Sequence, residues 1–142
     1  MFGGWSLYAK DGKPKYCYNL VGVEYTYVEG RGALPLGKHQ IRVELEYDGG
    51  GPRKGGDLAL FVDGKAVGTG RLEKTQAFLF SPDETCDVGN DTGTPVSQDY
   101  GPHGSAFNGE VNWMQIDVDE NAKDADHMVS SEEGVRIAMV RQ

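Results

Sequence analysis

Residues Ile41–Tyr47 read IRVELEY, and this stretch decides the fold class. Its apolar residues, from Ile41 onward, alternate with charged residues that begin at Arg42. Successive side chains of a β-strand point to opposite faces. The alternation therefore predicts a strand that has one face in a core and the other in water.

A second strand and a tight turn follow. Leu58–Val62 reads LALFV and ends at Asp63-Gly64, after which Lys65–Gly68 leads away. The pair Asp-Gly between two such segments predicts a hairpin, because both turn residues must tolerate positive φ. Similar patterns predict strands at Trp5–Lys10, Lys15–Val21, Tyr25–Tyr27, Gln76–Phe80 and Glu110–Val118, the last with a β-bulge between Trp113 and Met114.

Helical signal is confined to the end of the chain. Ser130 and Glu133 have the spacing of a capping box, and the apolar residues Val135 and Ile137 follow them. A length of 142 residues indicates one domain. Many short strands, glycine turns and one short C-terminal helix predict an all-β protein, a β-sandwich or jelly roll, that spans residues 1–142 as a single domain.

The composition limits the classes of partner. The chain has 14 Lys and Arg against 22 Asp and Glu, which gives a formal net charge of -8. This balance repels a phosphate backbone, and no polybasic run is present to bind an anionic membrane surface. No apolar stretch approaches the roughly 20 residues of a membrane-spanning helix. We therefore expect neither a nucleic acid nor a membrane as partner.

The first residues and the two cysteines bear on the cellular compartment. The chain does not open with a basic segment followed by an apolar one, which is the pattern of a secretory signal. Cys17 and Cys86 are far apart and share no C-x-x-C spacing. We expect two free thiols and a cytoplasmic location, with a single disulfide bond as the alternative.

Three segments, Gly37–Val43, Tyr47–Gly51 and Leu58–Gly68, give the order strand, glycine loop and hairpin. This order, with a hairpin of the form L-x-V-D-G-K-x-V-G, resembles the centre of concanavalin A-like and laminin-G-like sandwiches. Phe107–Val111 is similar to the closing strand of those domains. The resemblance implies a concanavalin A-like jelly roll and says little about function.

Further segments match a narrower family, and most of them are irregular in sequence. They are Phe2–Tyr8, Asp11–Pro14, Tyr18–Gly22, Ser81–Gly89, Asp91–Ser97 and Tyr100–Pro102. Together they resemble the C-terminal domain of bacterial arylsulfatases, and the resemblance covers almost the whole chain.

The resemblance implies an accessory role without catalysis. Sulfatases of this family convert a Cys or Ser within a C/S-x-P-x-R motif to formylglycine. Neither Cys17 nor Cys86, nor any serine of the chain, has proline two residues further on. We therefore expect no enzyme, but a module that packs against a sulfatase catalytic domain of the alkaline-phosphatase-like type.

In that family at least one strand precedes the segment that corresponds to Gly3-Gly4-Trp5. We therefore expect this chain to lack the first strand of the sandwich. A missing strand leaves an unpaired sheet edge, which predicts a homodimer or another partner strand at that edge.

An acidic loop is the candidate metal site. Asp83, Asp87, Asp91 and Asp99 lie in the irregular stretch Ser81–Ser105. Calcium takes six to eight oxygen ligands, which such carboxylates supply. The alternative is a solvated loop whose Asp and Asn residues cap turns. No other cofactor is expected.

Four tyrosines are the candidate ligand-binding residues: Tyr16, Tyr18, Tyr25 and Tyr27. On a shared face they would form an aromatic platform for a sugar, since the tyrosine ring is apolar and its hydroxyl is polar. The alternative is that they are ordinary half-buried strand residues. A free-standing carbohydrate-binding module is therefore the second functional hypothesis.

Glu44 and Glu46 also raise a third hypothesis. They lie two residues apart on one predicted strand, a spacing that roughly fits the carboxylate pair of a retaining glycosidase. The alternation of Arg42, Glu44 and Glu46 is equally typical of an exposed strand face, which is the simpler interpretation.

Overall fold

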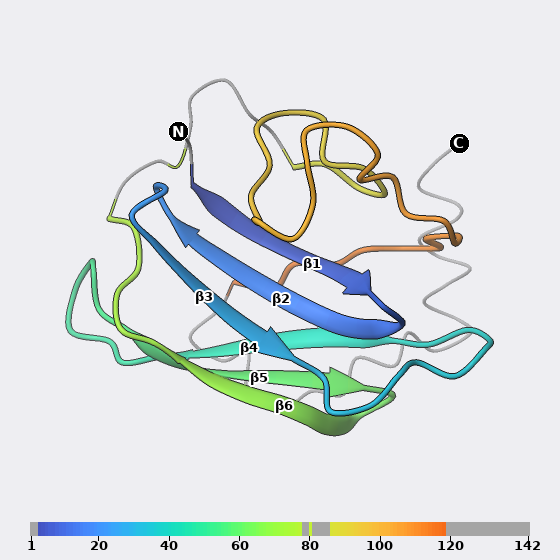
Figure 1. Ribbon diagram of the computed structural model, residues 1–142. Coiled ribbons are helices and arrows are strands. Elements are labelled where there is room, and N and C mark those ends of the chain that lie inside the picture. The colour runs from blue at the N-terminus through green and yellow to red at the C-terminus, as the bar shows by residue number, and fades with distance from the viewer. Residues whose placement is uncertain (1–2, 78–79, 81–85, 119–142) are drawn as a thin grey trace, which may run out of the picture. The chain divides into compact units, whose positions relative to one another are not determined.

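Figure 1 shows the computed structural model, which describes residues 3–77, 80 and 86–118. The chain divides into two units, Met1–Asn112 and Trp113–Gln142. All the described strands belong to the first unit, and the described residues 113–118 of the second form no strand. No helix within the described residues has the length and apolar character needed to cross a bilayer.

The first unit contains two antiparallel sheets with three described strands each (Figure 1). Consecutive strands pair, so the strand orders are β1-β2-β3 and β4-β5-β6. The strands are β1 (Gly4–Lys10), β2 (Lys13–Leu20), β3 (Glu24–Glu29), β4 (Ile41–Tyr47), β5 (Gly56–Val62) and β6 (Lys65–Leu72).

Two-residue turns of the same type close one hairpin in each sheet. Asp11 and Gly12 have φ angles of 52° and 76°, and Asp63 and Gly64 have φ angles of 49° and 75°. Positive φ at both positions is the signature of a type I′ turn, whose twist matches that of paired strands. The prediction of a hairpin at Asp63-Gly64 is confirmed.

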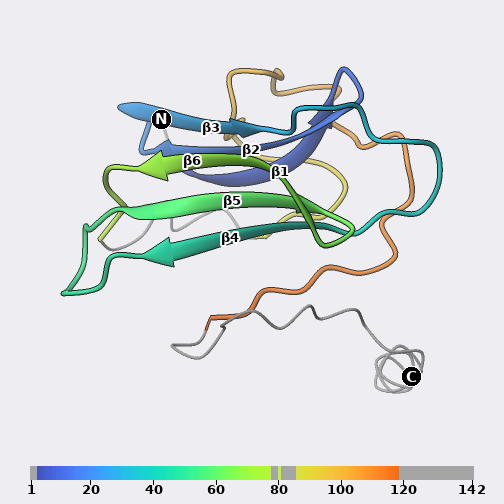
Figure 2. The same ribbon diagram turned by 90° about the horizontal axis from the view of Figure 1, so that it is seen from below.

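The two sheets lie in two layers and share one hydrophobic core (Figures 1 and 2). Burial of this apolar surface is the main term that holds the layers together. The first sheet supplies Tyr16, Tyr18 and Val28, and the second supplies Leu58, Leu60 and Leu72.

Glycines let β6 approach β3 closely at one side of the core. A Cβ atom added to Gly70 would lie 2.6 Å from Cγ2 of Val28, and one added to Gly68 would lie 2.6 Å from the carbonyl oxygen of Glu29. Larger residues would therefore force the sheets apart here. In the sheets formed by the described residues, β3 and β6 are end strands and lie together, so the other two end strands, β1 and β4, lie on the opposite side of the core.

The structure confirms an all-β fold, and the predicted strand Ile41–Tyr47 matches β4. One strand prediction is wrong, because Glu110–Val118 forms no strand. The sequence pattern there satisfied strand periodicity, but no neighbouring strand is present among the described residues to accept the backbone hydrogen bonds. Of the predicted strand Gln76–Phe80, residues 76, 77 and 80 are described and are not in a strand, and residues 78–79 lie outside the described residues.

Two further predictions concern local features. The bulge expected between Trp113 and Met114 is absent, since no strand forms there. A register shift instead occurs in the β5–β6 pair between Leu60 and Phe61. The helix predicted from Ser130 onward lies outside the described residues.

Candidate functional site

A segment of the chain covers the outer face of the first sheet, and the candidate site lies where this segment contacts the sheet. Segment 86–105, yellow to orange in Figure 1, lies over β1 and β2 on the side away from the core. As a result β2 is buried on both faces: Tyr16 and Tyr18 point to the core, while Cys17 and Asn19 point to the covering segment.

Asn19 anchors the covering segment. Its side chain is fully buried, and its Nδ2 donates a hydrogen bond of 3.0 Å to the carbonyl oxygen of Val96. Its Oδ1 accepts a bond of 2.6 Å from the backbone N–H of Gly22. The Sγ of Cys17 lies 3.9 Å from the same carbonyl of Val96. Both polar ends of the amide are thus satisfied, as burial requires.

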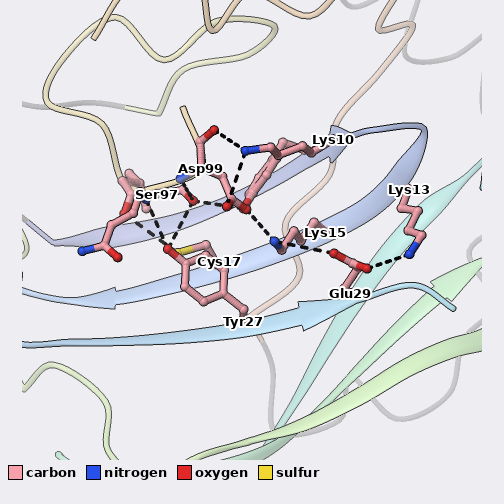
Figure 3. Close-up of polar contacts among 11 residues, drawn as sticks. Lys10, Lys13, Lys15, Cys17, Tyr27, Glu29, Ser97 and Asp99 are labelled. Atoms are coloured by element: carbon pink, nitrogen blue, oxygen red, sulfur yellow. Dashed lines mark hydrogen bonds and ion pairs between the residues drawn. The ribbon is translucent and has the colours of Figure 1, made fainter. Parts of the chain in front are cut away.

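Asp99 is the centre of a charged cluster on the same face (Figure 3). Its Oδ2 accepts hydrogen bonds of 2.5 Å from the Tyr8 hydroxyl and 2.6 Å from Nζ of Lys15. Its backbone carbonyl accepts a bond of 2.7 Å from Nζ of Lys10. Hydrogen bonds to ionised groups of this kind are shorter and stronger than neutral ones.

The cluster shifts the pKa values of its members. Burial alone would raise the pKa of Asp99, but the hydrogen bonds from Lys15 and Tyr8 outweigh it and hold this pKa below its ordinary value. The hydrogen bond to Asp99 raises the pKa of Lys15. Burial, and then the bond to Asp99, raise the pKa of Tyr8. The pair is therefore ionised and the phenol is neutral at neutral pH.

Ser97 and Tyr27 extend the cluster toward β3. The Oγ of Ser97 accepts a hydrogen bond of 3.1 Å from the backbone N–H of Asp99 and lies 3.0 Å from the Tyr8 hydroxyl. The Tyr27 hydroxyl accepts a bond of 3.2 Å from the N–H of Gln98. Three strands therefore bind one short stretch of the covering segment, residues 96–99.

This cluster contains a thiol but no activated nucleophile. Cys17 has an exposed fraction of 0%, and burial raises its pKa. The thiolate is the reactive form of cysteine, so a buried thiol with a raised pKa is poorly reactive. The described contacts of Asp99 and Asn19 hold the covering segment on the sheet.

The described aspartates among those predicted to bind calcium bond to other groups of the protein. Asp87 accepts hydrogen bonds from the backbone and hydroxyl of Thr92, and Asp91 accepts bonds from the N–H of Val96 and the hydroxyl of Tyr100. Asp99 is paired with Lys15. No group of three potential metal ligands occurs among the described residues, and Asp83 lies outside them.

The four predicted platform tyrosines do not share one face. Tyr16 and Tyr18 are buried in the core. Tyr27 pairs with Cys17 across the β2–β3 ladder, so Tyr27 and Tyr25 lie on the opposite side of the sheet. The rings of Tyr25 and Tyr27 are stacked with centroids 6.4 Å apart and an interplanar angle of 10°. The platform is thus reduced to two rings on β3.

The outer face of the second sheet carries charged side chains around a shallow hollow. Glu46, Asp57 and Arg71 are among the residues that line it, together with Glu44. Glu44 forms an ion pair with Arg42, whose guanidinium also lies 4.3 Å from the centre of the Phe61 ring. These contacts are typical of a solvated strand face.

The structure also reveals apolar side chains that the sequence analysis did not single out as a site. Trp5 and Leu7 pair with Tyr18 and Tyr16, so they lie on the core-facing side of β1. They nevertheless have exposed fractions of 43% and 37%. On the core-facing side of β4, Leu45 and Tyr47 are each 40% exposed. We call these four residues the open edge: Trp5, Leu7, Leu45 and Tyr47.

Comparisons with known proteins return no match. Neither a scan against family models, nor a search of curated proteins, nor a search of solved structures matches this chain.

Proposed function

We propose that this chain is a non-catalytic accessory domain that binds a protein partner along its open edge. The observation that carries this proposal is the exposure of Trp5 and Leu7 on the side of β1 that faces the core. The corresponding side of β4 exposes Leu45 and Tyr47. Large apolar residues exposed together are a common mark of a protein interface.

Binding of a partner would bury apolar surface of the open edge that water now contacts. Burial of one large apolar side chain contributes about 1.5–3 kcal/mol relative to its exposed state. Trp5 and Leu7 realise only part of this gain in the isolated chain. A partner that covers the edge would supply the remainder, and would also satisfy the backbone groups of the edge strand β1.

The resemblance to arylsulfatase C-terminal domains supports the accessory role and the class of partner. The proposal takes the fold to be a concanavalin A-like sandwich, of which the two described sheets are part. It takes a sulfatase catalytic domain as one partner class. The absence of a C/S-x-P-x-R motif from the chain supports a role outside catalysis.

Calorimetric titration tests this function. A separately expressed sulfatase catalytic domain should bind the chain, and Trp5→Ser should weaken binding at least tenfold. Leu36→Ser is the matched control, because Leu36 is fully exposed and lies outside both sheets. Purified chain should not hydrolyse p-nitrophenyl sulfate. Turnover of that ester, or equal effects of the two substitutions, would contradict the proposal.

A second candidate function rests on the stacked pair Tyr25 and Tyr27. Stacked rings on a strand face suit a sugar ring, so the second candidate is a carbohydrate-binding module. A glycan array probed with the chain and with Tyr25→Ala separates the two functions. Binding that is lost in the variant would favour this candidate, and an array without hits would remove it.

A further inference from the structure

We propose that a second copy of this chain occupies the β1 side of the open edge, with the two β1 strands paired antiparallel about a two-fold axis at Leu7. This inference rests on the proposed function and names one partner for the same edge.

The free side of β1 is defined by its hairpin. The two-residue turn Asp11-Gly12 is closed by the pair Lys10 and Lys13, which in a type I′ hairpin exchange both backbone hydrogen bonds. Hydrogen-bonded and non-bonded pairs alternate along an antiparallel ladder. The backbone N–H and C=O groups of Trp5, Leu7 and Ala9 therefore point away from β2. Within the described parts of the chain, no strand pairs with that side of β1.

The register centred on Leu7 matches these outward groups with their own copies over the whole length of β1. When Leu7 lies opposite Leu7 of the second copy, Trp5 lies opposite Ala9 of that copy, and Ala9 opposite its Trp5. All three pairs then exchange both backbone hydrogen bonds, and the seven residues of each β1 are paired from end to end. A shift by one residue would place outward groups against inward ones and lose these bonds.

The charges of β1 are compatible with this register, whereas β4 avoids opposed like charges only in particular registers. β1 carries a single charged residue, Lys10, which lies opposite Gly4 of the second copy in this register. β4 paired with itself about its centre would place Glu44 opposite Glu44. Like charges directly opposite each other destabilise a sheet. The β1 pairing therefore places no like charges opposite each other.

The apolar side chains favour the same arrangement. Trp5, Leu7 and Ala9 share the core-facing side of β1, and the two-fold axis would bring both sets together. Edge strands that remain monomeric commonly carry a proline, a bulge or an inward-pointing charge. β1 has none of these between Gly4 and Ala9, and its ladder with β2 is regular. Pairing would join the two β1–β3 sheets into one six-stranded sheet.

Light scattering after size exclusion tests the pairing. The wild-type chain should have about twice its monomer mass of 15.5 kDa. Leu7→Lys places a charge on the core-facing side, and Leu7→Pro removes one outward N–H that β2 does not use. Both variants should be monomers, whereas Leu36→Lys should remain a dimer. Circular dichroism checks that each variant is folded. A monomeric wild-type chain, or dimers unaffected by both Leu7 variants, would overturn the inference.

Cysteine cross-linking tests the register, in a Cys86→Ser background that removes the exposed native thiol. Opposed residues of a hydrogen-bonded pair have Cα atoms about 5.5 Å apart, which suits a disulfide. Leu7→Cys should therefore cross-link with itself under mild oxidation. Trp5→Cys should cross-link with Ala9→Cys but not with itself, because the two Trp5 positions are about 13 Å apart. Self-linking of Trp5→Cys in place of these products would refute this register.

The outcomes separate this inference from the proposed function. A monomeric chain that still binds the catalytic domain through Trp5 would contradict the proposed self-pairing and would agree with the accessory role. A dimer that binds no catalytic domain would keep the self-pairing and remove that class of partner. A monomer that binds nothing would end both.

Discussion

The two sheets are built alike but differ in what lies on their outer faces. Each contains three described antiparallel strands, a type I′ hairpin and three residues of the buried core. The outer face of β1–β3 is covered by segment 86–105, which binds it through Asn19 and the Asp99 cluster. The outer face of β4–β6 carries exposed side chains such as Asp57 and Arg71.

This difference shows that polar residues on a strand do not by themselves mark a solvent-facing side. β2 carries Lys15, Cys17 and Asn19 on its outer face, yet Cys17 and Asn19 are fully buried. β4 carries Arg42 and Glu44 on its outer face, and both keep part of their surface in water. The covering segment, and not the strand pattern, decides which polar groups become part of the stabilising structure.

The largest loss of stability is expected from a substitution in the core, which both sheets share. Leu60→Ala removes a fully buried side chain and should lower the free energy of unfolding by about 2–5 kcal/mol. Chemical denaturation followed by tryptophan fluorescence measures this change, and Leu36→Ala is the control. Amide exchange in β2 should accelerate together with that in β5. Acceleration confined to β5 would show that the sheets do not share one core.

A smaller loss of stability is expected from substitutions on the outer faces, and it should differ between the two sheets. Asp99→Asn removes the 2.6 Å ion pair of Lys15 and leaves its ammonium with the longer 3.6 Å contact to Glu29, and should cost about 1–3 kcal/mol. Asp57→Asn is the matched change on the other sheet, where Asp57 meets Arg71 in solvent, and should cost less than about 1 kcal/mol. Denaturation of both variants in the same buffer gives the comparison. Equal costs would mean that the covering segment adds nothing to the pairing of Asp99.

Local features of the fold could be predicted from sequence because their causes are local. β4 was predicted from the alternation that begins at Ile41, and the turn at Asp63-Gly64 was predicted from its positive φ requirement. Glu110–Val118 had the same kind of alternation and forms no strand. A strand also needs a partner for its backbone groups, and the alternation of a single segment carries no information about that partner.

The candidate site was harder to predict, because its members are distant in sequence. Tyr8 and Asp99 are separated by 91 residues, and no spacing rule connects them. The tyrosines illustrate the role of register. Tyr16 and Tyr18 are two residues apart in β2, as Tyr25 and Tyr27 are in β3. The β2–β3 ladder pairs Tyr27 with Cys17, so the two pairs of tyrosines lie on opposite faces of the sheet. The sequence suggests Asp99 as a calcium ligand because it shows the carboxylate but not the pairing of Asp99 with Lys15.

The smallest expected effect is the pH dependence of the stability that Asp99 contributes on the covered face. The pKa of Asp99 in the folded chain lies below its ordinary value, because the bonds from Lys15 and Tyr8 outweigh the effect of burial. An aspartate in the unfolded chain has a pKa of about 3.9. The stabilisation from Asp99 is therefore complete above that pH and is lost as the pH falls through the folded pKa. The difference in unfolding free energy between wild type and Asp99→Asn should shrink below about pH 4.

Denaturation curves collected between neutral pH and the acid limit of folding measure this difference. Leu36→Ala changes no titratable group, so its offset from wild type should stay constant with pH and serves as the control. A wild-type advantage over Asp99→Asn that persists unchanged into acid would show that the carboxylate contributes through its shape and neutral hydrogen bonds. In that case the ion pair with Lys15 would not be what distinguishes the covered sheet from the exposed one.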